Sequence, residues 1–230
     1  MTQFVEANNA VFRYEHVGNA EGAGAPLLLV HELGGDMTSW DPALAAGLCA
    51  NRPAMRFDWR GAGTSEKIRG HFDIDVMCAD IAGIVKETGF GDGKPVDVVG
   101  IALGGGVVIG FAARYPERLL TVTLASATAG YAKADHAARV DRLNARMNAI
   151  RDFGPAGMAE ARGREVLSPD ASDDALAKVR AVMSQLHVDG YCQAARMLHS
   201  SDLYDDIAPI AVPAMVMCGS ADKVTPEELN

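Results

Sequence analysis

Short apolar runs alternate with amphipathic stretches along most of this chain. The runs that read as strands are residues 11–17, 27–31, 55–59, 96–99, 119–124 and 214–218. Between the third and fourth runs, apolar residues recur at helical spacing over 74–85, with Asp73 as a helix cap before them and Gly89 as a helix end after them. This alternation predicts an α/β protein with a mostly parallel sheet that is flanked by helices.

The pattern changes between residues 130 and 205, where helical segments such as 137–150 and 174–186 follow one another without a convincing strand. We expect residues 1–129 and 206–230 to form the core and residues 130–205 to form a helical lid, inserted before the last strand. Ligands bind beyond the carboxyl ends of parallel strands, and a lid at this point of the chain would cover that edge. The alternative is a second helical layer without a gating role. Residues from Thr225 onward have the pattern of a helix start, but the sequence ends about one turn later, at Asn230. We therefore expect the core to be truncated at its C-terminus.

Residues 100–104, Gly-Ile-Ala-Leu-Gly, have the form of the Gly-x-Ser-x-Gly turn that projects a nucleophilic serine between a strand and a helix. Ala102 stands at the serine position. The apolar run before this segment and the glycine-rich helical stretch after it supply the strand and the helix that the motif requires. The amide of Leu103 can still hold an oxyanion in such a turn, but Ala102 has no oxygen with which to attack an acyl carbon.

The composition narrows the classes of partner. A formal net charge of −9 argues against a nucleic-acid or anionic-membrane surface, and a hydrophobic fraction of 49% with no long apolar run describes an ordinary globular protein. We therefore expect a small-molecule ligand and, without a secretory signal, a cytoplasmic location. The four cysteines are widely spaced and predict buried free thiols, with no metal site. The sequence leaves open whether the protein is a monomer or a homo-oligomer.

Five segments together resemble the α/β-hydrolase family, in the order in which that family shows them. They are residues 31–35, 58–65, 100–104, 115–118 and 219–222. Among the branches of the family, the chain looks most like the 3-oxoadipate enol-lactonases, through the segments 31–42 and 202–207. The resemblance implies the α/β-hydrolase fold, hydrolysis of an ester or a lactone, and no metal or organic cofactor.

The same resemblance implies roles for individual residues. Ala102 occupies the nucleophile position, Asp222 is the acid that orients a catalytic histidine, and the amides of Leu33 and Leu103 form the oxyanion hole. The histidine of that family would lie beyond Asn230, and none of the six histidines of this chain stands in the matching position.

Three residues of the segment 31–42 are candidates for the substrate pocket. His31 closes a strand and serves more simply to fix the following loop by hydrogen bonding. Glu32 stands where the family favours a small residue; facing solvent it changes little, whereas facing the pocket it could act as a general base. Trp40 either lines the pocket or packs beneath the lid.

The arginines at 139, 142 and 146 lie at near-helical spacing in the lid. Arg139 and Arg142 could bind a substrate carboxylate, or they could belong to a solvated helical face. Three functions stay open at this point: an ester or lactone hydrolase that has lost its nucleophile, a ligand-binding pseudoenzyme, and a non-acylating lyase or hydratase that uses Glu32 or a distal histidine as its base.

Overall fold

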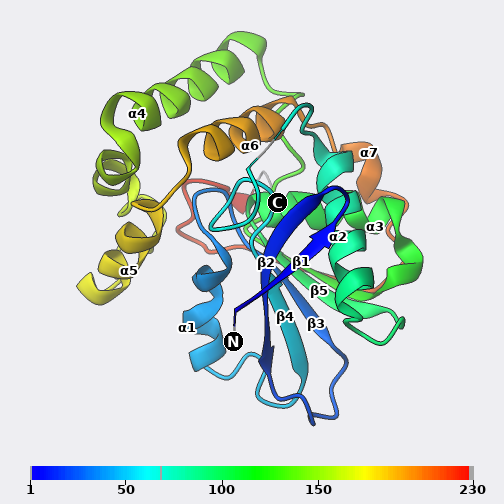
Figure 1. Cartoon of the computed structure of the whole chain (residues 1–230). Coiled ribbons are helices and arrows are strands. Elements are labelled where there is room, and N and C mark those ends of the chain that lie inside the picture. The colour runs from blue at the N-terminus through cyan, green and yellow to red at the C-terminus, as the bar shows by residue number, and fades with distance from the viewer. Residues whose placement is uncertain (1, 68, 228–230) are drawn as a thin grey trace.

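The computed structural model describes residues 2–67 and 69–227. Its centre is a seven-stranded sheet in the order β1-β2-β4-β3-β5-β6-β7 (Figure 1). The strands are β1 (Gln3–Ala7), β2 (Ala10–Gly18), β3 (Leu27–Val30), β4 (Pro53–Phe57), β5 (Val96–Ile101), β6 (Leu119–Ala125) and β7 (Ala214–Met217). Strands β3 to β7 are parallel, and only β1 and β2 add antiparallel pairs, so the predicted fold class is confirmed.

The helices are η1 (Met37–Trp40), α1 (Asp41–Ala45), α2 (Ile74–Thr88), α3 (Leu103–Arg114), η2 (Pro116–Arg118), α4 (His136–Arg162), α5 (Asp173–Met183), α6 (Val188–Ser200) and α7 (Tyr204–Ile207). Of these helices, α2 and α5 lie close to segments predicted from the sequence, and α4 begins as predicted but runs to Arg162. In helix α2, the Asp73 side chain accepts the amide of Val76 at 2.9 Å, and Gly89 ends the helix with a φ of 67°. Both caps satisfy backbone groups that a helix end leaves free.

The two faces of the sheet bury different clusters because successive side chains of a strand point to opposite sides. Leu28 and Val30 of β3 belong to the large cluster that includes the buried residues of α2 and α3. Leu27 and Leu29 belong to a smaller cluster with Trp40. At the edge of the sheet, the three apolar side chains Met215, Val216 and Met217 of β7 are each more than half exposed.

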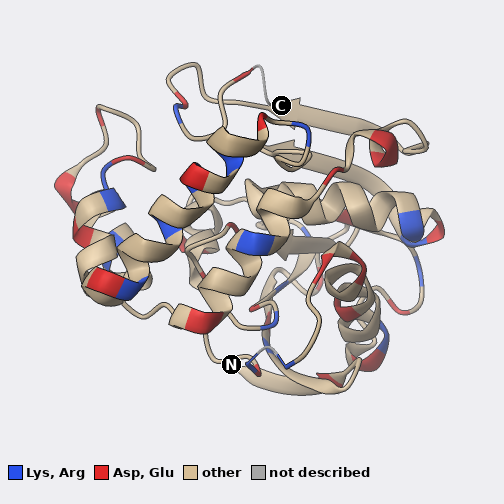
Figure 2. Ribbon diagram, turned by 90° about the horizontal axis from the view of Figure 1, so that it is seen from above, with Lys and Arg blue, Asp and Glu red and all other residues tan. Residues whose placement is uncertain are grey.

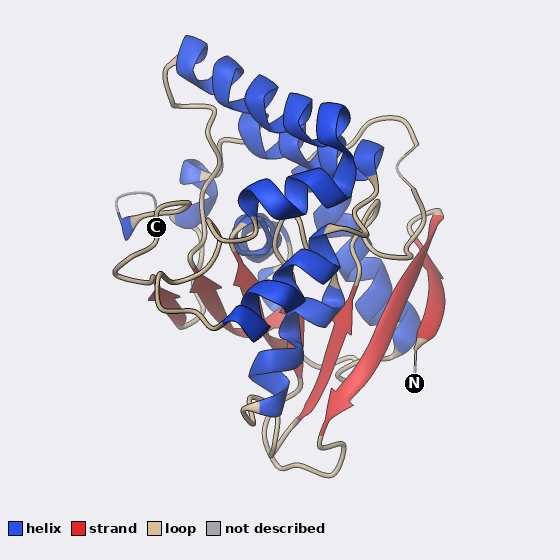
Figure 3. Cartoon of the chain, turned by 90° about the vertical axis from the view of Figure 1, so that its left-hand side faces the viewer, coloured by secondary structure: helices blue, strands red, loops and turns tan. Residues whose placement is uncertain are grey.

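The helical insertion, residues 130–205, contains α4, α5 and α6 and lies against the loops that follow β3 and β4 (Figures 1 and 3). Helix α4 is bent at Gly154, where φ is 66°, and Pro155 follows the bend. The insertion has its own apolar cluster, built around buried residues such as Met147 and Tyr191, and Leu33 of the core packs against it. The insertion therefore lies over the loops at the carboxyl ends of β3 and β4.

The two ends of the insertion meet in a neck, which we define as residues 129–132 and 198–203. Its backbone hydrogen bonds run from Tyr131 N to Leu198 O (3.3 Å), from Ala132 N to Ser201 O (3.0 Å) and from Leu203 N to Ala129 O (2.8 Å). Gly130, with a φ of 93°, lies so close to the Ser201 carbonyl that a Cβ there would stand 2.2 Å from its oxygen.

Candidate active site

The connection from β5 to α3 has the conformation that a nucleophile elbow requires. Ala102 adopts φ 50° and ψ −111°, a strained region for a residue with a side chain. Its amide donates to Ala125 O at 3.0 Å, and its carbonyl accepts the amide of Gly106 at 3.2 Å. The turn is thus held from both sides, and it projects a methyl group from the position that the sequence predicted for a nucleophile.

The first turn of α3 packs directly on the end of β3. A Cβ on Gly104 would stand 2.4 Å from the Val30 carbonyl oxygen and 2.5 Å from that of His31. Leu103 is the first residue of α3, so its amide is one of those that a helix leaves without an intrahelical acceptor. Leu33 lies just beyond His31 and is partly buried between the core and the insertion. The close packing at Gly104 therefore brings the segments of both predicted oxyanion-hole residues together.

His31 is fully buried and stacks on Trp59, with ring centroids 5.1 Å apart and an interplanar angle of 16°. His31 Nδ1 lies 3.1 Å from Trp59 Nε1, which can only donate, and 2.9 Å from the Glu32 carbonyl, which can only accept, so one tautomer satisfies only one of the two contacts. Burial lowers the pKa of His31, while the neighbouring charge of Glu32 opposes this effect. His31 is therefore neutral, and its contacts are those of a residue that fixes the loop after β3.

Glu32 turns back over its own loop. Its Oε1 accepts the hydroxyl of Ser39 at 2.8 Å, and its Oε2 is buried without a hydrogen-bond partner among the residues that the structure describes. Trp40, at the end of η1, is buried beside Leu27 and Leu29 in the smaller sheet cluster. Neither residue is among those that line the two cavities described below.

Asp222 lies in the loop after β7 and organises that loop. Its Oδ1 accepts the amides of Val224 (2.8 Å) and Thr225 (2.9 Å), and its Oδ2 accepts the Thr225 hydroxyl at 3.1 Å. Partial burial raises the pKa of Asp222. These hydrogen bonds and one from the Ser126 hydroxyl lower the pKa by more than burial raises it, so the net shift is downward. The Asp222 side chain is thus a carboxylate at neutral pH.

Ser126 connects Asp222 to the elbow, and sequence reasoning did not single it out. It follows β6 with a φ of 46°, and its amide donates to Met217 O at 2.7 Å. The preceding residue, Ala125, accepts the amide of Ala102. Through these contacts the ends of β5, β6 and β7 bring Ala102 and Asp222 to one edge of the sheet, as the order of a parallel sheet favours.

A cavity of about 800 Å³ lies between the bent helix α4 and the loop after β7. Its charged lining residues are Arg142, Arg146, Arg162, Arg164, Glu165 and Lys223. Arg142 lies over the Tyr131 ring, 5.9 Å from its centroid. Arg139 is not part of the lining; it donates to the carbonyl of His199 at 3.3 Å instead. The predicted pair of lid arginines is therefore divided, with Arg142 at the cavity and Arg139 at the neck.

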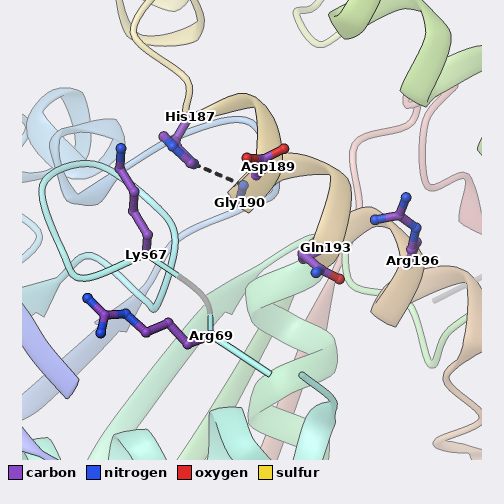
Figure 4. Close-up of a pocket in the computed structure, with 7 residues that line it drawn as sticks. All are labelled: Lys67, Arg69, His187, Asp189, Gly190, Gln193 and Arg196. Atoms are coloured by element: carbon purple, nitrogen blue, oxygen red, sulfur yellow. Dashed lines mark hydrogen bonds between the residues drawn. The ribbon is translucent and has the colours of Figure 1, made fainter. Parts of the chain in front are cut away.

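A smaller cavity of about 460 Å³ lies at the start of α6 (Figure 4). Lys67 and Arg69 approach it from the loop after β4, and His187 caps α6 by accepting the amide of Gly190 at 3.1 Å. Lys67, Arg69 and Arg196 are all exposed, so this cavity is a surface hollow. Its lining includes neither Ala102 nor Leu33.

The described residues contain no group of three or more His, Cys, Asp and Glu side chains that could hold a metal ion. Cys49, Cys78 and Cys192 are buried free thiols. Over residues 2–67 and 69–227, no helix combines the length and the apolarity that a membrane crossing needs.

A family model described as "alpha/beta hydrolase fold" matches residues 25–230. The chain is 26% identical over 215 residues to the 3-oxoadipate enol-lactonase 1 of Acinetobacter baylyi. The alignment covers 91% of this chain and 75% of that protein. The crystal structure of the enol-lactonase from Burkholderia xenovorans superposes with a TM-score of 0.86 at 25% identity, over 99% of this chain and 85% of that one. An esterase from Exiguobacterium antarcticum has a TM-score of 0.87 at 20% identity, over 100% of this chain and 85% of that chain, and shows the same fold.

Proposed function

The chain belongs to the alpha/beta hydrolase fold family, and on that premise we propose that it is an ester or lactone hydrolase scaffold, similar to the 3-oxoadipate enol-lactonases, with alanine at the nucleophile position. The observation that carries the proposal is the backbone of Ala102. A φ of 50° with a ψ of −111° costs on the order of 1–3 kcal/mol for a residue with a side chain. Such strain persists where a turn must project one side chain between a strand and a helix.

The roles of the surrounding residues follow from that position. The amides of Leu33 and Leu103 bind the oxyanion, because their segments meet where Gly104 packs on the end of β3. Asp222, a carboxylate that is linked to the elbow through Ser126, orients a histidine base. The helical insertion acts as the lid, since it lies over the loops at the carboxyl ends of β3 and β4 and is joined to the core at the neck.

A serine at position 102 would supply the missing step. Its Oγ would attack the acyl carbon, the base would take its proton, and the negative charge would develop against the two amides. The alcohol or enolate would then leave with that proton, and water would hydrolyse the acyl-enzyme. The methyl group of Ala102 cannot begin this sequence, so we propose that the protein with alanine is inactive in acyl transfer.

The test is hydrolysis of a panel of activated esters and carboxylated enol-lactones by the protein and by its Ala102→Ser variant, both made from the complete reading frame. We expect turnover only with serine, at least about a thousandfold above the alanine protein, because removal of a nucleophile costs factors of this order or more. An Ala102→Gly variant, which keeps the turn and also lacks a hydroxyl, is the matched control. If neither protein hydrolyses any ester or lactone, the scaffold serves ligand binding, as a pseudoenzyme would.

The second candidate function is base chemistry by Glu32, as in a lyase or hydratase. It is favoured by one observation: Glu32 Oε2 is buried and has no hydrogen-bond partner among the described residues. A Glu32→Gln variant of the alanine protein would then lose that activity, whereas Ser39→Ala would free Oε1 and keep the carboxylate. Equal rates in the native protein and in Glu32→Gln would exclude this candidate.

A further inference from the structure

The cavity between α4 and the loop after β7 has a charge opposite to that of the whole chain. Four arginines and Lys223 line it against a single acid, Glu165, whereas the formal net charge of the protein is −9. Along the helices of the insertion, Lys and Arg positions alternate with Asp and Glu positions (Figure 2), so the excess of positive charge belongs to the lining of this cavity. Since this region is positive on an acidic protein, the local potential favours an anion there.

The arginines of this cavity differ in how far they are neutralised. Arg162 lies 3.4 Å from Glu165, and Arg164 lies 3.5 Å from Asp173. For Arg142 and Arg146, no carboxylate of the described residues lies within 4 Å of the guanidinium nitrogens. Two positive charges thus face the cavity without a protein counter-charge.

Two buried groups beside these arginines also lack partners. Arg146 Nε is buried without a hydrogen-bond acceptor among the described residues. His199 on α6 is 2% exposed, its ring lies 5.0 Å from that of Tyr131, and both of its nitrogens are unpartnered within the same part of the chain. His199 lies outside the lining of the cavity, whereas Arg146 is part of it. Buried donors normally have partners, so the free Nε of Arg146 favours an acceptor that comes from outside the chain.

We infer that this cavity binds a small molecule with two negative charges, either a dicarboxylate or a phosphate, through the guanidinium groups of Arg142 and Arg146. Guanidinium groups bind both kinds of anion with paired hydrogen bonds. Ala221, Val224 and Pro226 close the opposite wall, so the anion lies between the insertion and the loop of Asp222. This site goes beyond the proposed ester chemistry and does not depend on it, because Ala102 is not part of its lining.

Isothermal titration calorimetry on the protein with Ala102 tests the inference at constant ionic strength. The probes are succinate for a dicarboxylate, inorganic phosphate for a phosphate and acetate for a single carboxylate. We expect succinate or phosphate to bind at least about tenfold more tightly than acetate, since one further charge-assisted hydrogen bond corresponds to about this factor. Tighter binding of succinate would indicate a dicarboxylate ligand, and tighter binding of phosphate would indicate a phosphate ligand.

The variants Arg146→Gln and Arg142→Gln should each weaken dianion binding at least about tenfold. Arg151→Gln is the matched control, because Arg151 lies on the same helix, is exposed and is absent from the lining. Arg142 is exposed as well, so its variant carries the test even if Arg146→Gln fails to fold. The inference is overturned if neither dianion binds at millimolar concentration, if acetate binds as tightly as the dianions, or if Arg151→Gln weakens binding as much as Arg142→Gln. Since no turnover is measured, these outcomes leave the hydrolase proposal unaffected.

Discussion

Two histidines, one in the core and one in the helical insertion, are buried to the same degree in opposite electrostatic surroundings. His31 follows β3 and stacks on Trp59, and its Nδ1 contacts both Trp59 Nε1 and the Glu32 carbonyl. His199 lies at the end of α6, and neither of its nitrogens has a partner among the described residues. Burial lowers both pKa values, but Glu32 raises that of His31, whereas Arg146 adds to burial and lowers the pKa of His199 to about 4. The charges that act on His31 are therefore acidic, whereas those that act on His199 are basic.

The largest expected effect comes from removing the partnered histidine. His31→Ala leaves a cavity beside Trp59 and an unsatisfied indole N–H, so we expect a loss of about 3 kcal/mol in the free energy of unfolding. His199→Ala should cost less, because it removes two unpartnered nitrogens together with its packing. Urea denaturation measures both, with His71→Ala, at an exposed side chain, as the control. Equal losses for the two buried histidines would contradict the comparison.

The free energy of unfolding should depend on pH through His199. The folded-state pKa of His199, about 4, lies below its ordinary value of 6.5, so the unfolded chain binds more protons between these values and stability falls as pH falls through this window. We expect His199 to contribute a loss on the order of 2 kcal/mol between pH 7 and pH 4.5. His199→Phe keeps an aromatic ring beside Tyr131 and cannot titrate, so urea denaturation of this variant should show a smaller loss.

His16 and His31 also have lowered pKa values and act in the same direction, so the difference between the native protein and His199→Phe is the relevant quantity. Carboxylates with shifted pKa values, such as Glu15 and Asp222 with lowered values and Asp58 and Asp80 with raised values, are present in both proteins and cancel in this difference. A native protein and a His199→Phe variant with parallel pH profiles would show that His199 is not held neutral by its surroundings.

The smallest effects are expected from the neighbouring charges. Glu32→Gln removes a charge that raises the pKa of His31, so that pKa should fall. Arg139→Gln removes a positive charge that lowers the pKa of His199 less than burial and Arg146 do, so that pKa should rise only slightly. We therefore expect a smaller shift there, with stability in both variants within about 1 kcal/mol of the native value. NMR titration of the two imidazole rings checks this, and a larger shift at His199 than at His31 would contradict it.

Much of the fold could be predicted from local patterns. The strands from β2 to β7 read as apolar runs, and α2 was recognisable because Asp73 and Gly89 stand at its ends. Strand β1 was not predicted, although the turn that pairs it with β2 is visible in Asn8 and Asn9, whose φ values are 44° and 59°. Asparagine tolerates this left-handed region better than most residues, and two in succession are a hairpin signal.

The candidate site could be predicted only where a motif carried it. Ala102 and Leu103 follow from five consecutive residues, and the structure gives Ala102 the strained backbone of an elbow. His199 and Arg162 could not be found in this way, because they reach the region of Arg146 only through the bend of α4 and the packing of α6. The Gly-Pro pair at 154–155 signals that bend but does not say where the helix goes afterwards. Contacts of this kind depend on tertiary packing, which no local spacing encodes.

The neck makes the insertion a replaceable module. The chain leaves and re-enters the core at two hydrogen-bonded neighbours, and between them α6 contributes Ala194 and Met197 to the large core cluster. The entropy of closing such a loop rises only with the logarithm of its length, so each doubling adds about 0.6 kcal/mol. Segments of a different length or charge could therefore replace α4 and α5 while α6 and the neck are kept, and evolution or a designer could exchange the ligand without rebuilding the elbow.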